Sequence, residues 1–344
     1  MMQKNDYQLT GFNGEGTFGR VANCVDLNTG EVVAVKIFKT NDNDVIQSEM
    51  AMLEKVRALD PDQNNIVKFI ENFTFHKLPC VVFEMLDRSL WNLMEEREWT
   101  ELSLNEIRPV TQQLLVACEA LKNIGIIYMD MKPDNIMFVN HKDQPFKIKL
   151  IDFGLALPVS QGEVGEGIQT FAYGAPEVIL GLPFSEAVDM WGVGCIMAFM
   201  YFVHLTKVSE SFFYSAKNLE DAVKRYPKKQ DNLEYEDRIA FLDLLKCCLN
   251  TNAEQRICPR EPRQLCLNSD KDSAPSGFTR KSASSYTLPE RSRDKHLYTD
   301  IPSPCNLPGP SAAIYKDDID EGIVEYNHKP STSYHSFPVK LPNV

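Results

Sequence analysis

Five polar side chains have the types and spacing needed to move a phosphoryl group from a magnesium nucleotide to a hydroxyl. Asp130, Lys132 and Asn135 fall within one short loop, and Asp152 follows two apolar runs later, just before a Phe-Gly pair. We expect Asp130 to accept the proton of the attacking hydroxyl and Lys132 to neutralise charge on the phosphate in flight. Asn135 and Asp152 offer the oxygen ligands that magnesium prefers. The hydroxyl of Thr170 is expected to bond Asp130 and Lys132 and to form the floor under a substrate Ser or Thr.

A glycine-rich segment near the start offers a place for the phosphates. Gly14, Gly16, Gly19 and Val21 form a GxGxxGxV pattern, and glycines let a backbone approach phosphates closely. The apolar runs on both sides predict two strands, whereas a dinucleotide-binding loop leads from a strand into a helix. The setting therefore favours a loop that covers the phosphates of ATP and argues against a dinucleotide oxidoreductase.

Lys36 stands in the middle of an apolar run, where a solvated lysine would be out of place. We expect its charge to grip the α- and β-phosphates of ATP, beside Ala34. Glu49 lies on a helix predicted over residues 44–58 and is the expected ion-pair partner of Lys36. The alternative is an ordinary glutamate on a solvated helix face. Leu53 lies one turn after Glu49 on this helix, so we expect both side chains to face inward.

The strand-rich part of the chain ends at a segment that suits an adenine edge. Backbone groups at Phe83, Glu84 and Leu86 are expected to hydrogen-bond the adenine, because no side-chain chemistry is required there. A plain strand end with a connector explains the same residues. The segment is therefore a nucleotide-binding prediction that depends on the rest of the site.

Three further polar residues are interpreted as structural supports rather than as chemistry. Glu177 has an expected buried partner in Arg256, and such a pair would tie its segment to the last helix. Asp189 opens the most apolar helix, where a buried carboxylate needs backbone donors.

The composition limits the other function classes. The chain has 344 residues, and its net charge of −12 argues against a direct nucleic-acid partner, since there is no basic surplus to displace counterions. Nine scattered cysteines without CxxC pairs indicate reduced thiols and an intracellular protein. The N-terminus lacks the apolar core of a signal peptide, and the apolar run at 191–205 is too short to span a bilayer, so no membrane partner is expected.

The periodicity predicts strands with one helix first and helices afterwards. Strand-like runs are expected over 7–12, 21–25, 32–38 and 80–83, and near Ile66 and Val67. Further helices are predicted from a capping box at Ser103 to Gly125, and over 185–204 and 236–249. Pro109 is expected to mark a kink or a later start of its helix. After Pro259 the composition turns polar and proline-rich, and residues 261–344 are predicted to be a disordered tail.

These motifs, in this order, resemble the eukaryotic protein kinase domain over roughly residues 7–259. Four stretches resemble the homeodomain-interacting protein kinases, of the dual-specificity tyrosine-regulated branch: 82–86, 107–113, 132–137 and 177–184. The resemblance implies an α+β, bilobal protein kinase fold. A small antiparallel sheet with one helix would form the N-lobe over 7–86, and a mainly helical C-lobe would cover 87–260.

The same resemblance implies what the protein does. It implies a protein serine/threonine kinase that uses ATP and Mg²⁺ to phosphorylate protein substrates, with dual-specificity autophosphorylation. It also implies transcriptional regulators as partners and the nucleus as the compartment, with the cytoplasm as the alternative.

The residues before Asp130 depart from the usual kinase pattern. Tyr128 and Met129 stand where most protein kinases have His and Arg. The homeodomain-interacting group also lacks that arginine, so Met129 is interpreted as a trait of the lineage. The ring of Tyr128 is expected to pack against Phe153.

The segment before Ala175 departs further from the group. The place of its autophosphorylated tyrosine falls at Gly167, and two flanking arginines appear as Phe171 and Gly174. Loss of the tyrosine removes the usual ordering switch. Loss of the arginine at 174 removes the basis for expecting proline after the target residue. These changes leave a non-catalytic, ATP-binding scaffold as the alternative function.

Overall fold

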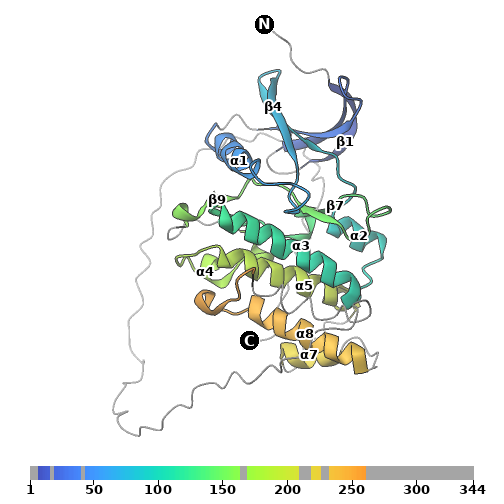
Figure 1. Cartoon of the computed structure of the whole chain (residues 1–344), viewed down its shortest axis with the longest axis vertical. Coiled ribbons are helices and arrows are strands. Elements are labelled where there is room, and N and C mark those ends of the chain that lie inside the picture. The colour runs from blue at the N-terminus through green and yellow to red at the C-terminus, as the bar shows by residue number, and fades with distance from the viewer. Residues whose placement is uncertain are drawn as a thin grey trace, which may run out of the picture. The chain divides into compact units, whose positions relative to one another are not determined.

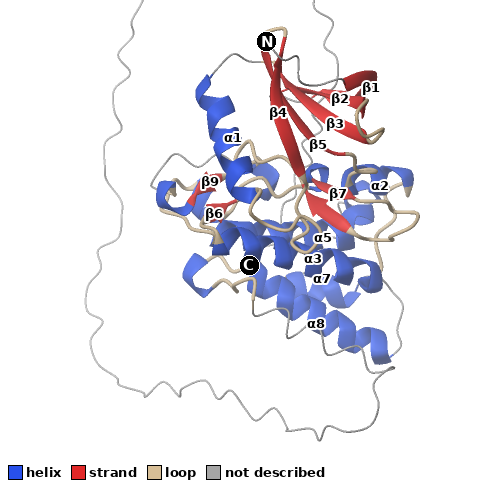
Figure 2. Ribbon diagram, turned by 45° about the horizontal axis from the view of Figure 1, so that its top comes forward, coloured by secondary structure: helices blue, strands red, loops and turns tan. Residues whose placement is uncertain are grey.

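The computed structural model describes residues 7–15, 19–39, 43–162, 169–208, 218–225 and 232–260, and all of them belong to one compact unit. The long strands lie together with one helix beside them, and helices make up most of the remainder (Figures 1 and 2). This is the predicted α+β architecture. Gly16, Gly167 and the tail predicted over 261–344 lie outside the described residues, and the division at 86/87 stays a prediction.

Five strands form one antiparallel sheet in the order β1-β2-β3-β5-β4. The four predicted strand runs correspond to β1, β2, β3 and β5, with somewhat different ends. The strands are β1 (Tyr7–Glu15), β2 (Gly19–Asp26), β3 (Val32–Phe38), β4 (Phe69–Phe75) and β5 (Leu78–Glu84). The run at Ile66 and Val67 is buried but precedes β4, because Ile66 bridges Leu150 instead of joining the sheet. The strand expected at that run is therefore wrong.

The two faces of this sheet have different uses, because side chains alternate along a strand. One face carries a small core of fully buried residues from three strands: Ala22, Cys24, Val33, Val35, Cys80 and Val82. The opposite face carries Lys36, which pairs with Val21 on β2 and with Val81 on β5. Helix α1 (Asn43–Val56) reaches this second face through Glu49, and its Leu53 is buried as expected.

The remaining long helices are α2 (Leu90–Glu96), α3 (Leu104–Asn123), α5 (Ala187–Val208), α7 (Leu219–Arg225) and α8 (Asn232–Cys248). The three helices predicted after residue 58 correspond to α3, α5 and α8, with somewhat different ends, and the structure adds the shorter α2 and α7. Helix α3 begins at the expected capping box, where the Ser103 N–H donates to Glu106 Oε2 at 2.8 Å. Pro109 lies inside α3, so a later start is wrong; its fixed φ suits a helix, and it removes one ladder hydrogen bond. Figure 1 shows α3, α5 and α8 side by side, and these helices contact one another.

Short elements between α3 and α5 carry the site. They are β6 (Ile126–Ile127), η1 (Pro133–Asn135), β7 (Ile136–Phe138), β8 (Ile148–Leu150), β9 (Leu157–Pro158), η2 (Val159–Gln161), η3 (Phe171–Tyr173) and α4 (Pro176–Ile179); η4 (Ala253–Gln255) follows α8. Strand β7 pairs with β8, and β6 pairs with β9. These two small two-stranded sheets bring the loop at Asp130 next to the segment that begins at Asp152.

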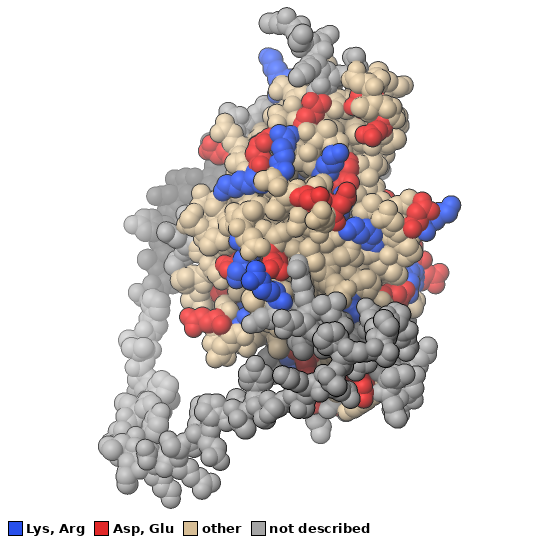
Figure 3. Space-filling view, in the orientation of Figure 1, with Lys and Arg blue, Asp and Glu red and all other residues tan. Residues whose placement is uncertain are grey.

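Acidic and basic side chains are interspersed on the face shown in Figure 3. In the part of the chain that the structure describes, no helix is long and apolar enough to cross a membrane.

Candidate active site

Asp130 is the centre of a hydrogen-bond cluster built from two segments, its own loop and the segment at Thr170. Its Oδ2 accepts from Lys132 Nζ at 2.7 Å and from Asn135 Nδ2 at 2.7 Å, and its Oδ1 accepts from Thr170 Oγ1 at 3.0 Å. Asn135 Nδ2 also donates to the Asp130 carbonyl, which closes the loop on itself. The expected bond from Thr170 to Asp130 is present, whereas no bond from Thr170 to Lys132 is found among the described residues. Asp130 is buried, and its carboxylate accepts hydrogen bonds from three donors, which hold it in one orientation.

The backbone just before Asp130 has an unusual conformation that Asp189 stabilises. Met129 is fully buried with φ of 69°, a left-handed value that costs free energy for a residue other than glycine. The Tyr128 and Met129 N–H groups donate to the two carboxylate oxygens of Asp189, at 2.9 and 3.0 Å. Burial raises the pKa of Asp189 to about 6, although these two donors favour its ionised form. The expected support by Asp189 is thus present, with its donors identified.

Tyr128 fills the space beneath this loop. Its ring meets Phe153 edge-on, with centroids 5.4 Å apart and an interplanar angle of 75°, so the expected packing is present. Its hydroxyl donates to the carbonyl of Ile151, immediately before Asp152. Burial raises the pKa of Tyr128 well above its ordinary value, so the hydroxyl remains a donor. Tyr128 therefore links the loop at Asp130 to the segment at Asp152.

Lys36 joins three elements through its ammonium group. Its Nζ lies 2.6 Å from Glu49 Oε1 on α1 and 2.9 Å from Asp152 Oδ1. The predicted ion pair with Glu49 is therefore formed, and the solvated alternative for Glu49 is excluded because Glu49 is buried. Asp152 has φ of 57°, a second left-handed residue at the site. Strand β3, α1 and the segment after β8 thus converge on one charge.

These contacts determine which groups are ionised. Burial acts to lower the pKa of Lys36, but Asp152 and Glu49 outweigh it and the pKa is raised, so the ammonium stays charged. Burial raises the pKa of Glu49 above its ordinary value, against the charge of Lys36. Burial also acts to raise the pKa of Asp152, but Lys36 prevails and that pKa is lowered. Asp152 therefore remains the carboxylate that a metal ligand must be.

Three predicted nucleotide contacts share the Lys36 face of the sheet. Val21 pairs with Lys36, and Ala34 pairs with Phe83, so the side chains of Val21, Ala34 and Phe83 lie on that face. Gly14 pairs with Val21, one residue before the end of β1, and Gly19 opens β2. A Cβ at Gly19 would lie 2.5 Å from the carbonyl oxygen of Ile37, so packing against β3 also requires glycine there.

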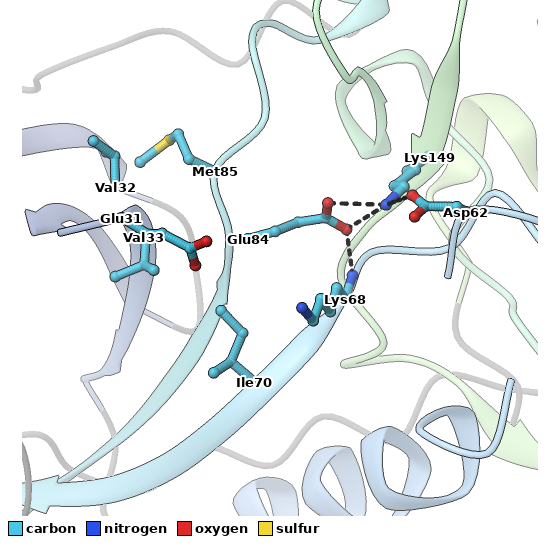
Figure 4. A pocket seen from close by; sticks show the side chains of 9 residues that line it. All are labelled: Glu31, Val32, Val33, Asp62, Lys68, Ile70, Glu84, Met85 and Lys149. Atoms are coloured by element: carbon cyan, nitrogen blue, oxygen red, sulfur yellow. Dashed lines mark hydrogen bonds and ion pairs between the residues drawn. The ribbon is translucent and has the colours of Figure 1, made fainter. Parts of the chain in front are cut away.

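The side chain of Glu84 is directed away from this face. Glu84 pairs with Val33 and therefore points to the opposite side from Phe83. It accepts from Lys149 Nζ at 2.7 and 2.9 Å, and Lys149 also contacts Asp62 at 2.7 Å (Figure 4). These side chains line a pocket of about 410 Å³ behind the segment from Glu84 to Leu86. Any contribution of Glu84 to nucleotide binding is thus limited to its backbone, while Leu86 is buried just after it.

Lys149 is a residue that the sequence interpretation missed. It is 1% exposed and occupies the middle of an apolar strand, β8. The same signal, a lysine among apolar neighbours, identified Lys36, so it was available in the sequence.

Gln169 was also missed: its Nε2 donates to the Met129 carbonyl at 3.1 Å, and its Oε1 accepts from the Ala175 N–H at 2.9 Å. No spacing or composition signal marks Gln169.

The expected pair of Glu177 and Arg256 is present and buried. Arg256 Nη1 and Nη2 donate to the two Glu177 carboxylate oxygens at 2.6 and 2.9 Å, a bidentate geometry. Arg256 also donates to the carbonyls of Ala187 and Asn250. The pair therefore ties α4 to the start of α5 and to the end of the described chain.

The site fits magnesium bound together with phosphates. Within the described ranges, no group of three or more His, Cys, Asp or Glu residues is arranged to hold a metal ion. Magnesium is commonly held by one or two protein oxygens plus substrate phosphates. Asn135 and Asp152 offer that small, hard donor set, and Lys36, which contacts Asp152, would add positive charge for the phosphates.

The sequence of this chain is similar to those of known protein kinases. The sequence model of the protein kinase domain matches residues 7–266. Homeodomain-interacting protein kinase 1 of Mus musculus is 41% identical over 199 residues, which cover 57% of this chain and 16% of that protein. Homeodomain-interacting protein kinase 4 of Homo sapiens is 41% identical over 196 residues, which cover 56% of this chain and 32% of that protein. The chain therefore spans no more than about a third of the length of these relatives.

The predicted resemblance and the predicted fold are both confirmed. The family match covers most of the chain, and the described residues have the five-stranded antiparallel sheet and the helices that the family implies. This chain belongs to the protein kinase family.

Proposed function

We propose that this chain is a protein serine/threonine kinase, which transfers the γ-phosphoryl group of ATP to hydroxyl groups of protein substrates. The observation that carries the proposal is the cluster at Asp130. Its carboxylate accepts hydrogen bonds from Lys132, Asn135 and Thr170. The second proposed acid, Asp152, forms an ion pair with Lys36.

In the proposed transfer, Asp130 accepts the proton of the substrate hydroxyl, and the charge of the phosphates is neutralised by Lys132 and by Mg²⁺. A substrate hydroxyl beside Thr170 passes its proton to the Asp130 carboxylate as its oxygen bonds to the γ-phosphorus and the bond to ADP breaks. The three donors on Asp130 keep its carboxylate in position for that proton. Lys132 Nζ, 2.7 Å from Asp130 Oδ2, adds positive charge where the transferred group passes. Mg²⁺, held by Asn135 and Asp152 when ATP is bound, supplies further neutralisation of the phosphates.

The nucleotide would lie under the Lys36 face of the sheet. Lys36, oriented by Glu49, would contact the α- and β-phosphates, and the segment from Gly14 to Gly19 would cover them. Val21, Ala34 and Phe83 lie on the same face as Lys36, which supports contact with the base. Backbone groups of Glu84 and Leu86 would bond the adenine edge.

The alternative is a kinase fold that binds ATP but performs no transfer. Its basis is the altered segment at Gly167, Phe171 and Gly174. Against it, none of the expected chemical groups is replaced, and the groups contact one another as transfer requires. We therefore propose the enzyme.

One assay tests the proposal directly. The full chain is incubated with γ-labelled ATP and either a generic basic protein or no added substrate, with and without Mg²⁺. We expect label on both the basic protein and the chain itself, only with Mg²⁺, and acid hydrolysis to release phosphoserine and phosphothreonine. Absence of label together with measurable ATP binding would select the scaffold instead.

The partners and the compartment are proposed from the relatives alone. The names of the relatives describe kinases that interact with homeodomain proteins. By that similarity we infer transcriptional regulators as protein substrates or partners and the nucleus as the compartment. Localisation of the tagged full chain and co-purification with homeodomain proteins test this inference.

A further inference from the structure

The five-stranded sheet is strongly curled, so that its two outermost strands, β1 and β4, meet. Tyr7 on β1 stacks on Phe73 of β4, with ring centroids 5.5 Å apart, and the Tyr7 hydroxyl donates to Glu71 Oε1 at 2.6 Å. These contacts close the sheet around the small core that includes Val33, and Ile70 packs against the same core. The open mouths of closed sheets are common sites for small ligands.

The pocket in Figure 4 lies at such a mouth, between the connection from β2 to β3, the start of β4 and the end of β5. Its volume is about 410 Å³, which is within the range of small-molecule sites. Val33 lines this pocket and lies three positions before Lys36 on β3, so the two side chains face opposite sides of the sheet. The pocket is therefore separate from the proposed nucleotide site.

One wall of the pocket is a network of charges that already have their partners. The Glu84 carboxylate accepts from Lys149 Nζ at 2.7 and 2.9 Å and from the backbone N–H of Lys68 at 2.6 Å. Lys149 also pairs with Asp62 at 2.7 Å. Because Lys149 is buried and three bonds hold Glu84, this wall is in place before any ligand binds.

Two other charged groups at the pocket have no partner. Neither the Glu31 carboxylate nor the Lys68 ammonium forms a hydrogen bond or an ion pair with the residues that the structure describes. Glu31 precedes β3 and Lys68 precedes β4, so the two charges reach the pocket from different segments (Figure 4). A ligand that carries both an ammonium and a carboxylate group would pair with both of them.

The rest of the lining is apolar and consists of Val32, Val33, Ile70 and Met85. Glu31 and Lys68 are exposed, and ion pairs with exposed groups contribute little binding free energy. Burial of a large apolar side chain contributes more. A ligand of this pocket therefore needs apolar surface as well as its two charges.

We propose that this pocket binds a zwitterionic α-amino acid with a large apolar side chain, such as leucine or phenylalanine. The ammonium group of the ligand pairs with Glu31, its carboxylate pairs with Lys68, and its side chain contacts Val33 and Ile70. The inference is independent of the proposed kinase function, because the pocket uses no side chain that is assigned to phosphoryl transfer.

Isothermal titration calorimetry of the full chain with L-leucine and L-phenylalanine tests the proposal. We expect one molecule to bind per chain with a Kd of about 1 mM or lower. N-acetyl-L-leucine lacks the ammonium group, L-leucinamide lacks the carboxylate and glycine lacks the side chain, so each should bind about fivefold or more weakly than L-leucine. Equal affinity for all four compounds, or no binding of either apolar amino acid at about 20 mM, would overturn the inference.

Two variants assign each charge of the ligand to its partner. Glu31→Gln should abolish the difference in affinity between L-leucine and N-acetyl-L-leucine, and Lys68→Met should abolish the difference between L-leucine and L-leucinamide. Lys77→Met, at an exposed lysine in the turn from β4 to β5, is the matched control and should keep both differences. All three side chains are exposed, so the variants should melt at the wild-type temperature. Wild-type differences in both pocket variants would overturn the assignment.

A competition experiment separates this pocket from the nucleotide site. In the presence of Mg²⁺ and a saturating non-hydrolysable ATP analogue, the Kd of L-leucine should stay within about threefold of its value without nucleotide. Complete loss of L-leucine binding would place the amino acid in the nucleotide site and overturn the inference. Absence of phosphoryl transfer to every substrate would overturn the proposed function alone, since binding of the amino acid is measured without transfer.

Discussion

Lys36 Nζ donates to Asp152 Oδ1 over 2.9 Å, which joins β3 to a segment 116 positions further along the chain. The same ammonium holds Glu49 at 2.6 Å, so one cation serves two carboxylates in a largely buried place. Removing the cation would leave both acids without their partner. This relationship makes Lys36 a stability element as well as a proposed phosphate contact.

Lys36→Met should lower the free energy of unfolding by about 3 kcal/mol at neutral pH, because a broken buried ion pair leaves uncompensated charge. In the wild type the pKa of Asp152 is lowered, so its contribution to stability is present above its ordinary pKa and is lost as pH falls. Without Lys36, burial should raise the pKa of Asp152 and raise that of Glu49 further. Ionisation of both acids would then oppose folding.

The destabilisation by Lys36→Met should therefore grow as pH rises from about 4 to about 7. Urea unfolding at several pH values measures this difference. Lys246→Met, which breaks the exposed pair with Glu220, is the control and should cost less than about 1 kcal/mol. A destabilisation that does not change with pH would contradict the proposed charge balance.

Asp130→Asn should reduce phosphoryl transfer by about 10³-fold, because the amide cannot accept the proton of the substrate hydroxyl. ATP affinity should stay within about threefold of wild type, since Asn can keep several of the local hydrogen bonds. Single-turnover transfer and ATP titration measure the two quantities. Asp243→Asn, at an exposed position on α8, is the matched control. Equal transfer by Asp130→Asn and wild type would remove Asp130 from its proposed role.

Lys149→Met should destabilise the chain by about 3 kcal/mol and weaken ATP binding. Lys149 is buried, and its loss leaves Glu84 without the cation that holds the strand end next to the proposed adenine site. Lys68→Met is a close control, because Lys68 lines the same pocket (Figure 4) and its backbone N–H keeps its bond to Glu84. If both variants give the same melting temperature and ATP affinity, Lys149 does not support the proposed adenine site through Glu84.

Glu177→Gln should cost about 3 kcal/mol of stability, because it leaves the buried Arg256 guanidinium without its carboxylate. Glu54→Gln removes the partner of Arg57 in an exposed pair and should cost less than about 1 kcal/mol. Chemical denaturation of the two variants measures the contrast. Similar small losses in both would mean that the Glu177 pair contributes little.

Several features could be predicted because they depend on local chemistry. The spacing of Asp130, Lys132 and Asn135 fits inside one short loop, so their contacts need little more than the loop itself. Strand-like apolar runs located β1, β2, β3 and β5, and a capping box located the start of α3. Hydrophobic spacing also indicated that Glu49 and Leu53 face inward together. The strand expected at Ile66 failed because a buried apolar run fits a bridge to Leu150 equally well.

Other features depend on contacts that no local pattern encodes. Lys36 and Lys149 look alike in sequence, each a lysine within an apolar strand, yet one reaches Asp152 and the other holds Glu84. The direction of each depends on which face its strand presents to the neighbouring elements. Gln169 gained its two bonds only when the segment before α4 folded back onto Met129.

The sequence by itself determined the chemistry proposed for this protein: which groups would move a proton, hold a phosphate or bind magnesium, because these proposals follow from residue type and short spacing. Only the tertiary structure decided how the groups are held and what they face. The left-handed backbone at Met129, stabilised by Asp189 sixty positions later, exists because packing brings α5 beneath the loop. The exposure of Phe171 beside Asp130 likewise arises from long-range contacts that orient one segment over another.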